Sequence, residues 1–224
     1  MSVITPQDVD CFCGRPTLRI DDCDSLACLS EAPDLEVLAL QHFPKITSLE
    51  RLRSLSKLRY LSLSTTIGWD GTNKHLTVDS FEPLVSLKKL ELLQILGVVP
   101  KHGRLEPLSR ITSLRKLSIG STSFYQLEDF AALSISLPRA RESLRPVCQM
   151  NFVSTCRRCQ KYPLLSLEGA RPRAPRYACP SCGKKKIISH LERWNSAGGV
   201  PQFSSAEDMS PADLIEEFGN PNAK

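Results

Sequence analysis

The chain has 224 residues, a hydrophobic fraction of 41% and a formal net charge of +5. This composition is enough for one domain or two small ones with buried cores, and no stretch approaches the roughly 18–20 consecutive apolar residues of a membrane-spanning helix. The N-terminus has no basic segment followed by an apolar run. We therefore expect no signal peptide, no membrane association and a cytoplasmic location.

The charge is unevenly distributed along the chain. Residues 1–138 carry 15 Lys and Arg against 16 Asp and Glu, residues 139–193 carry 13 against 3, and residues 194–224 carry 1 against 5. The modest net charge therefore conceals a strongly basic segment between a near-neutral one and an acidic one.

A leucine pattern recurs through the first part of the chain. Copies of Leu-x-x-Leu-x-Leu, the last ending in Ile, begin at Leu35, Leu58, Leu87 and Leu114, and a shorter copy is Leu18-x-Ile20. The expected strand anchors, 20, 23, 29 and 27 residues apart, are Leu18, Leu38, Leu61, Leu90 and Leu117. Periods of roughly 20–29 residues with this consensus are typical of leucine-rich repeats, which this region resembles.

Each copy predicts a short parallel strand, because alternate strand residues share a face and both leucines would then point into the core. A second motif, apolar-Glu-x-apolar, occurs at 49–52, 81–84, 105–108 and 127–130. Its spacing predicts one helical or 3₁₀ turn on the convex side, with Pro83 and Pro107 near the start. The fold class is therefore α/β, a leucine-rich repeat solenoid over residues 12–137.

The repeats resemble the compact leucine-rich repeats of bacterial cytoplasmic proteins, and this resemblance implies binding of another protein. An adaptor and an immunity protein that neutralises a toxin would both fit. We expect an aromatic anchor and charged residues on the concave face, and two longer units to insert loops at a binding edge. The candidate partner-binding residues are Tyr60, Ser62, Trp69, His75, Lys89, Glu91 and Lys116. An ordinary solvated sheet face would also show such residues.

Residues 138–151 are basic and predict a cap or linker, since terminal repeats need a polar cover. The following module, residues 152–196, contains Cys156-Arg-Arg-Cys159 and Cys179-Pro-Ser-Cys182. Each Cys-x-x-Cys places two thiolates on a tight turn, and two such turns complete a tetrahedral site. The module resembles a small β zinc ribbon, with strands expected at 162–167, 176–178 and 184–189.

We expect the four cysteines to hold one structural Zn²⁺, because four thiolates leave no open position for a reactive water. His190 follows the last strand, but the ligand set is already complete. The remaining cysteines, expected to be buried free thiols, are Cys11, Cys13, Cys23, Cys28 and Cys148. A second metal site built from the first four of these is the alternative, although its spacing matches no common pattern.

The basic residues around the cysteines predict an alternative function, binding of nucleic acid by the ribbon with the repeats as a scaffold. The candidate residues are Arg157, Arg158, Lys161, Arg173, Arg176, Lys184, Lys185 and Lys186. An acidic protein, or the acidic tail of this chain, would meet the same cations. That tail, residues 197–224, is expected to be flexible with one short helix from Pro211, capped by Ser210.

We expect no enzymatic activity. The four histidines lie in different repeats and in the ribbon, and the sequence has no Gly-rich phosphate loop or Gly-x-Ser-x-Gly motif. The sequence therefore predicts a binding protein of two modules.

Overall fold

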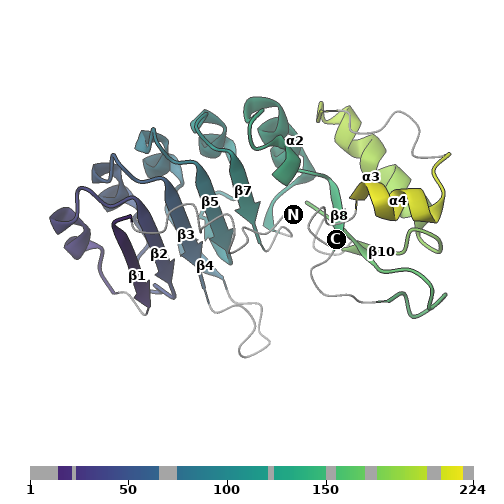
Figure 1. Cartoon of the computed structure of the whole chain (residues 1–224), viewed down its shortest axis with the longest axis horizontal. Coiled ribbons are helices and arrows are strands. Elements are labelled where there is room, and N and C mark those ends of the chain that lie inside the picture. Colours follow the sequence, from purple (N-terminus) through teal and green to yellow (C-terminus); the bar gives the residue numbers. More distant parts are fainter. Residues whose placement is uncertain are drawn as a thin grey trace.

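The computed structural model describes residues 15–21, 24–65, 75–120, 124–149, 155–169, 176–200 and 208–218. They form an arc of parallel strands with short helical turns along its outer side, followed by a smaller module of strands and two helices (Figure 1). None of the helices in these ranges has the length and apolar character needed to cross a membrane.

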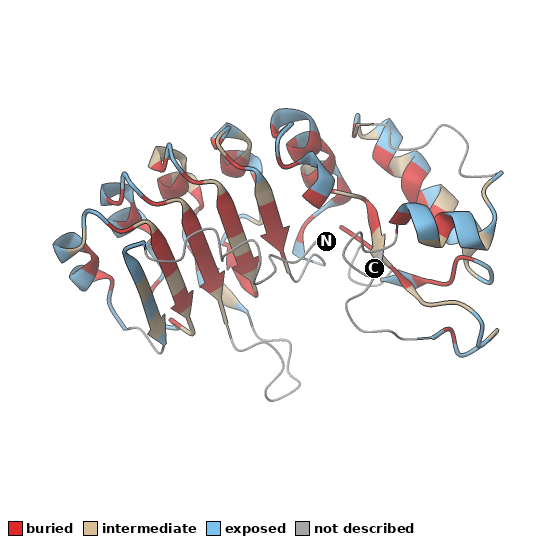
Figure 2. Ribbon diagram, in the orientation of Figure 1, coloured by how far each residue is buried: buried red, intermediate tan, exposed pale blue. Residues whose placement is uncertain are grey.

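The main sheet is parallel, with strand order β1-β2-β3-β5-β7. Its strands are β1 (Thr17–Asp21), β2 (Val37–Gln41), β3 (Tyr60–Ser64), β5 (Leu92–Leu96) and β7 (Lys116–Ile119). Their pairing places Leu18, Leu38, Leu61, Leu93 and Leu117 side by side. The strands after β1 are largely buried, whereas β1 at the open end is more exposed (Figure 2). The predicted α/β repeat solenoid is confirmed.

Short 3₁₀ helices return the chain on the convex side, as the second motif predicts. They are η1 (Ala27–Glu31), η2 (Glu50–Ser54), η3 (Glu82–Ser86) and η4 (Glu106–Arg110). The backbone N–H of Leu52 donates to the carbonyl of Leu49 at 2.9 Å, closing a three-residue turn. The last motif instead extends into an α-helix, α2 (Leu127–Ser136), where the carboxylate of Asp129 accepts the backbone N–H of Gln126 at 3.1 Å.

The inward side chains of all repeats form one continuous apolar core that runs from Leu26 to Leu144 and also includes Trp194. A second, two-stranded parallel sheet, β4 (Leu76–Val78) with β6 (Val98–Pro100), lies in the two longer repeats. Stacking lets each repeat bury a face that it could not bury alone.

The repeat that begins at Leu87 has a different register from the predicted one. Our anchors were Leu90 and Leu92, but Leu93 and Ile95 lie opposite Leu61 and Leu63. Lys89 and Glu91 therefore precede β5 and are not on its concave face, so this part of the prediction was wrong. Leu92 instead packs with Val37 and Tyr60 in a small apolar cluster on the other side of the sheet from the core.

The C-terminal module contains a three-stranded antiparallel sheet in the order β10-β9-β8. Its elements are β8 (Val147–Gln149), β9 (Leu165–Leu167), β10 (Tyr177–Ala178), α3 (Lys184–Ser196) and α4 (Pro211–Phe218). Their apolar residues form a second, smaller core. The backbone N–H of Asp213 donates to Ser210 Oγ at 3.2 Å, so Ser210 caps α4. Leu214 and Phe218 are buried, and this helix packs on the module.

The third ribbon strand that we expected at 184–189 is wrong, because these residues begin α3. Ile187, Leu191 and Trp194 are buried and recur at helical spacing, whereas Ser189 and Glu192 between them are exposed. A window that ends at residue 189 holds too little of this period to distinguish it from a strand.

The two modules are joined by direct packing. Residues of 140–144, which include η6 (Arg141–Ser143), cover the last repeat, and Ser143 Oγ accepts the backbone N–H of Leu117 at 3.0 Å. Trp194 of α3 is fully buried in the solenoid core, and its indole N–H donates to the carbonyl of Val200 at 3.1 Å. A Cβ at Gly199 would lie 2.4 Å from the Trp194 ring, so only glycine fits there.

Candidate metal centre

Two tight turns bring the four predicted metal ligands together. The sulfur atoms of Cys156, Cys159, Cys179 and Cys182 all lie within 4.8 Å of one another. The backbone N–H of Cys182 donates to Cys179 Sγ at 3.4 Å, and Gln160 takes a positive φ of 54° directly after Cys159. These contacts bend the chain so that both sulfurs of each turn point inward.

The sulfur separations suit a tetrahedral metal ion. Four thiolates at about 2.3 Å from Zn²⁺ have sulfur atoms roughly 3.8 Å apart. Cys159 Sγ and Cys179 Sγ lie 3.6 Å apart. The residues present therefore fit a Cys₄ metal ion without rearrangement of the turns.

Local hydrogen bonds already favour the thiolate form at two of the ligands. The backbone N–H of Lys161 is the largest influence on Cys159 and lowers its pKa to about 6. The backbone N–H of Cys159 likewise lowers the pKa of Cys156. Loss of hydration raises the pKa of Cys179 and, together with the nearby thiolates, that of Cys182. Because adjacent thiolates repel one another, a divalent cation is what allows all four to ionise.

His190 lies away from the four sulfurs. Its Nε2 is 3.2 Å from the carbonyl oxygen of Pro146, and the side chain is buried. Among the described residues, the group able to hold a metal consists of the four cysteines. His190 therefore serves the junction between α3 and the solenoid cap.

A polar cluster that sequence reasoning missed lies between β8 and β9. The thiol of Cys148 donates to Glu168 Oε1 at 3.2 Å, and Ser166 Oγ donates to the same oxygen at 3.0 Å. Burial raises the pKa of Cys148 to about 12, so it stays a protonated, unreactive thiol at neutral pH. Cys28 is exposed, which contradicts the burial that we expected for it. Cys11, Cys13 and Cys23 lie outside the described residues.

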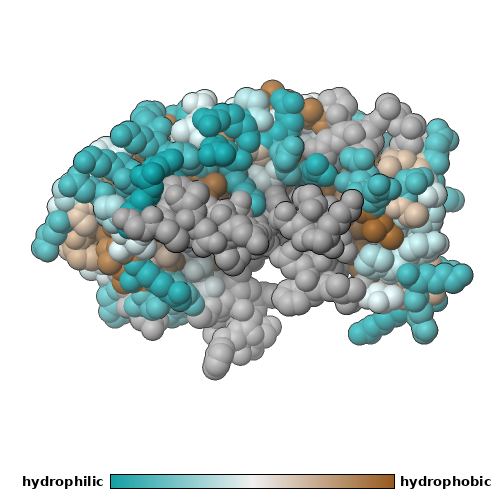
Figure 3. Space-filling view, in the orientation of Figure 1, coloured by the Kyte–Doolittle hydropathy of each residue, from teal (hydrophilic) through white to brown (hydrophobic). Residues whose placement is uncertain are grey.

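The described members of the predicted nucleic-acid set lie within four residues of a cysteine ligand in the chain. Those with exposed side chains are Arg157, Arg158, Lys161, Arg176, Lys185 and Lys186, and Lys184 is half-buried. None of these six exposed residues forms an ion pair within the described part of the chain. By contrast, Arg193 of α3 pairs with Glu128 at 3.6 Å. Arg173 lies outside the described residues. Much of the described surface in this view, including that of the module, is hydrophilic (Figure 3).

The described members of the predicted partner-binding set lie on or just before β3, β4, β5 and β7. Tyr60 and Ser62 are on β3, each only 8% exposed, and both hydroxyls donate to Gln94 Oε1. Lys116 begins β7, while Lys89 and Glu91 precede β5. Trp69 lies outside the described residues. The buried Tyr60 therefore has little surface left to offer a partner.

His75 is exposed and forms an aromatic contact that no sequence pattern indicates. Its ring centroid lies 4.4 Å from that of Phe124, with an angle of 50° between the planes. Phe124 is 38% exposed, although its neighbour Tyr125 is buried and donates its hydroxyl to the Val98 carbonyl at 2.9 Å. We call this pair the aromatic edge. It lies beside β4 and β6.

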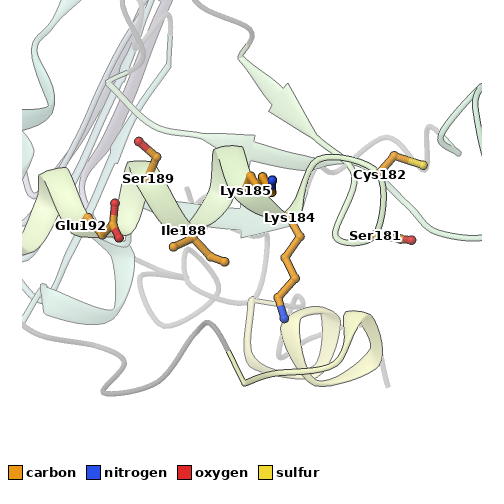
Figure 4. Close-up of a pocket in the computed structure, with 7 residues that line it drawn as sticks. All are labelled: Ser181, Cys182, Lys184, Lys185, Ile188, Ser189 and Glu192. Atoms are coloured by element: carbon orange, nitrogen blue, oxygen red, sulfur yellow. The ribbon is translucent and has the colours of Figure 1, made fainter.

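An open groove of about 650 Å³ follows one face of α3 next to the second cysteine turn (Figure 4). It is lined by Ser181, Cys182, Lys184, Lys185, Ile188, Ser189 and Glu192. One side of the metal centre is therefore accessible from the groove through Cys182.

Comparisons with solved structures find partial matches, each at 20% identity or less. No family model and no curated protein matches the chain. Internalin C2 from Listeria monocytogenes is 20% identical over 52% of this chain and 44% of its own, with a TM-score of 0.36. A leucine-rich repeat protein from Leptospira interrogans is 17% identical over 54% of this chain and 29% of its own, with a TM-score of 0.39. Internalin InlF from Listeria monocytogenes is 19% identical over 61% of this chain and 49% of its own, with a TM-score of 0.29. This chain covers less than half of each of these structures.

Proposed function

We propose that this chain is a non-enzymatic protein-interaction module, an adaptor or an immunity protein, that binds another protein through its repeat solenoid. The observation that carries the proposal is the aromatic edge, where Phe124 is exposed against His75. Aromatic side chains exposed at a rigid surface are enriched at protein interfaces and often dominate their energetics. The exposed Lys89 and the half-buried Lys116 are further candidates.

The C-terminal module, in this proposal, is a zinc ribbon with one structural Zn²⁺. Four thiolates fill a tetrahedral coordination sphere, so the ion supplies folding energy and leaves no open position for chemistry. The described cysteines form no disulfide, which suits a reducing compartment, and we place the protein in the cytoplasm. Metal analysis of the purified chain tests this, with one zinc per chain as the expected result and bound iron as the contradicting one.

The binding proposal is tested by co-purification of the tagged chain from its own host after nuclease treatment. A stoichiometric protein partner is expected with the wild type and is lost with Phe124→Ala and His75→Ala. Ile135→Ala is the matched control, because Ile135 is an exposed apolar residue on α2. A partner that is retained by both edge variants would place the binding surface elsewhere.

A second candidate function is nucleic-acid binding by the ribbon. It is favoured by the six exposed cations around the metal centre that form no ion pair with the rest of the described chain. Lys and Arg side chains that remain unpaired retain their full attraction for phosphates.

A further inference from the structure

The groove on α3 and the two cysteine turns bring cations from separate parts of the chain to one surface. Arg157 and Arg158 lie between the ligands of the first turn, and Lys185 lies three residues after the last ligand. Because the four sulfur atoms lie within 4.8 Å of one another, these two turns adjoin. A bound metal would fix the spacing of the cations that flank it.

The acidic groups near this surface leave its cysteine end positive. Glu192 lines the end of the groove away from the cysteine turn (Figure 4). On α4, Asp213 lies within the electrostatic reach of Lys184. Residues 155–169 and 176–200 carry eight Lys and Arg against two Glu, and residues 208–218, which include α4, add four carboxylates. Four thiolates on a divalent ion add two negative charges, so these parts of the module are close to neutral as a whole. The positive charge is concentrated, because seven of the eight cations lie within four residues of a cysteine ligand in the chain.

The remaining groups favour one kind of anion. Ser181 and Ser189 place hydroxyl donors in the groove, and hydroxyls with Lys and Arg are the usual ligands of backbone phosphates. Tyr177, on β10 just before the second turn, is 45% exposed. An exposed ring on the strand that leads into a cationic turn can stack on an unpaired base, which a duplex, an acidic polypeptide or a lipid headgroup does not offer.

We propose that the cationic surface around the four-cysteine cluster, centred on the α3 groove, binds the phosphate backbone of single-stranded nucleic acid. Arg157 from the first cysteine turn and Lys185 from the start of α3 contact phosphates, and Tyr177 stacks on a base. This inference rests on the second candidate function above. It uses no residue of the aromatic edge, so either surface can fail without the other.

The test is a fluorescence-anisotropy titration of the full, zinc-loaded chain with labelled oligonucleotides of about 20 nucleotides, which exceeds one ordinary site. The probes are oligo(dT), oligo(rU) and a DNA duplex, with polyglutamate as a competitor. We expect the single strands to bind, with affinity falling steeply with salt at a log–log slope of roughly 0.7 per phosphate contacted. The two single strands then show whether DNA or RNA is preferred.

Two variants locate the surface. Arg157→Gln with Lys185→Gln is expected to weaken binding about tenfold and to lower the salt slope by roughly 1.4, since two phosphate contacts are lost. Tyr177→Ala is expected to weaken binding to single strands roughly tenfold and to leave the salt slope unchanged. The matched control, Arg51→Gln with Lys88→Gln, removes the same charge from exposed residues of the solenoid and should bind as the wild type does.

Three results would overturn the proposal. The first is no binding of either single strand at low salt by a chain that holds its zinc. The second is an equal loss in the control variant, which would show attraction to net charge alone. The third is a change of preferred ligand. Displacement by polyglutamate would assign the surface to an acidic protein. Duplex binding as tight as single-strand binding, and insensitive to Tyr177→Ala, would assign it to duplex DNA.

Discussion

The solenoid and the C-terminal module differ in how far their Lys and Arg side chains are paired with carboxylates. In the solenoid, charges alternate from repeat to repeat just before each strand. Glu36 lies 2.5 Å from Arg15 and 3.9 Å from Arg59, and Glu91 lies 2.5 Å from Arg59 and 3.4 Å from Arg115. The exposed cations around the metal centre have no such partners in the described chain. Ion pairs thus neutralise part of the charge on the solenoid, whereas the exposed cations around the metal centre are available for a partner.

The same two regions also differ in what stabilises them. The solenoid core contains apolar residues from every repeat, while the module has a short cluster from three strands and two helices. A core this small does not offset the chain entropy lost on folding, so such modules depend on a metal or a neighbour. This module has a candidate for each, the four cysteines and the docking of Trp194.

Loss of a metal ligand should have the largest effect and should separate the two regions. We expect Cys179→Ser to release the metal and unfold the module, because structural zinc supplies about 10–16 kcal/mol in comparable small modules. Hydrogen exchange should show that α3 loses protection while β2 and β3 keep theirs. Cys28→Ser, at an exposed cysteine, is the control. Equal loss in β2 and β3 would contradict the separate stabilities.

Removal of the junction tryptophan should affect both regions at once. Trp194→Ala leaves a large cavity in the solenoid core and should cost about 3–5 kcal/mol in the free energy of unfolding. Urea denaturation measures this cost. Arg193→Ala removes only the partly exposed pair with Glu128 and should cost less than about 1 kcal/mol. A similar small cost for Trp194→Ala would mean that the modules are not coupled.

The register of the repeat that begins at Leu87 can be tested by substituting Leu93 and Lys89. Leu93 is fully buried, so Leu93→Ala should destabilise the chain by about 2–5 kcal/mol. Lys89 is exposed and precedes β5, and Lys89→Ala should stay within about 0.5 kcal/mol of the wild type. Thermal unfolding of both variants is the measurement, and a small effect at Leu93 would restore the register predicted from the sequence.

The ion pairs that Glu91 forms before the strands of the solenoid should contribute less to the free energy of unfolding. Glu91→Gln leaves Arg59 and Arg115 without their shared carboxylate and should destabilise the solenoid by about 1 kcal/mol at low salt. The loss should shrink as salt is added, because ions screen the pairs. Denaturation at two salt concentrations checks this, and a salt-independent loss would point to packing instead.

The smallest effect should come from protonation of His190. Burial, and then the positive charge of Arg193, lowers the pKa of His190, while Glu168 acts in the opposite direction. A lowered folded-state pKa means that the unfolded chain takes up the proton first as pH falls below about 6.5. Stability is therefore full above that pH and declines below it. His190→Gln should reduce this decline in urea denaturation curves at acid pH, and an unchanged decline would assign it to the metal ligands.

The repeated leucines predicted the solenoid because their spacing indicates which residues face the core. They did not decide the register at residues 87–96, where Leu87, Leu90, Leu92, Leu93 and Ile95 supply apolar residues for two different alignments. Pairing with β3 resolves this, since the backbone N–H of Leu92 donates to the Arg59 carbonyl at 3.0 Å. In this register Leu92 lies on the face of the sheet opposite the core and packs with Tyr60, which the sequence analysis predicts to be an exposed anchor.

The sequence by itself determined the parallel solenoid, its convex turns and the four-cysteine cluster, because each depends on a short spacing that local geometry enforces. The tertiary structure decided which surfaces remain exposed. It buried Tyr60, brought His75 against Phe124, and placed Trp194 of the second module in the core of the first. These contacts join residues far apart in the chain, and their burial depends on all of their neighbours at once, so no local pattern could predict them.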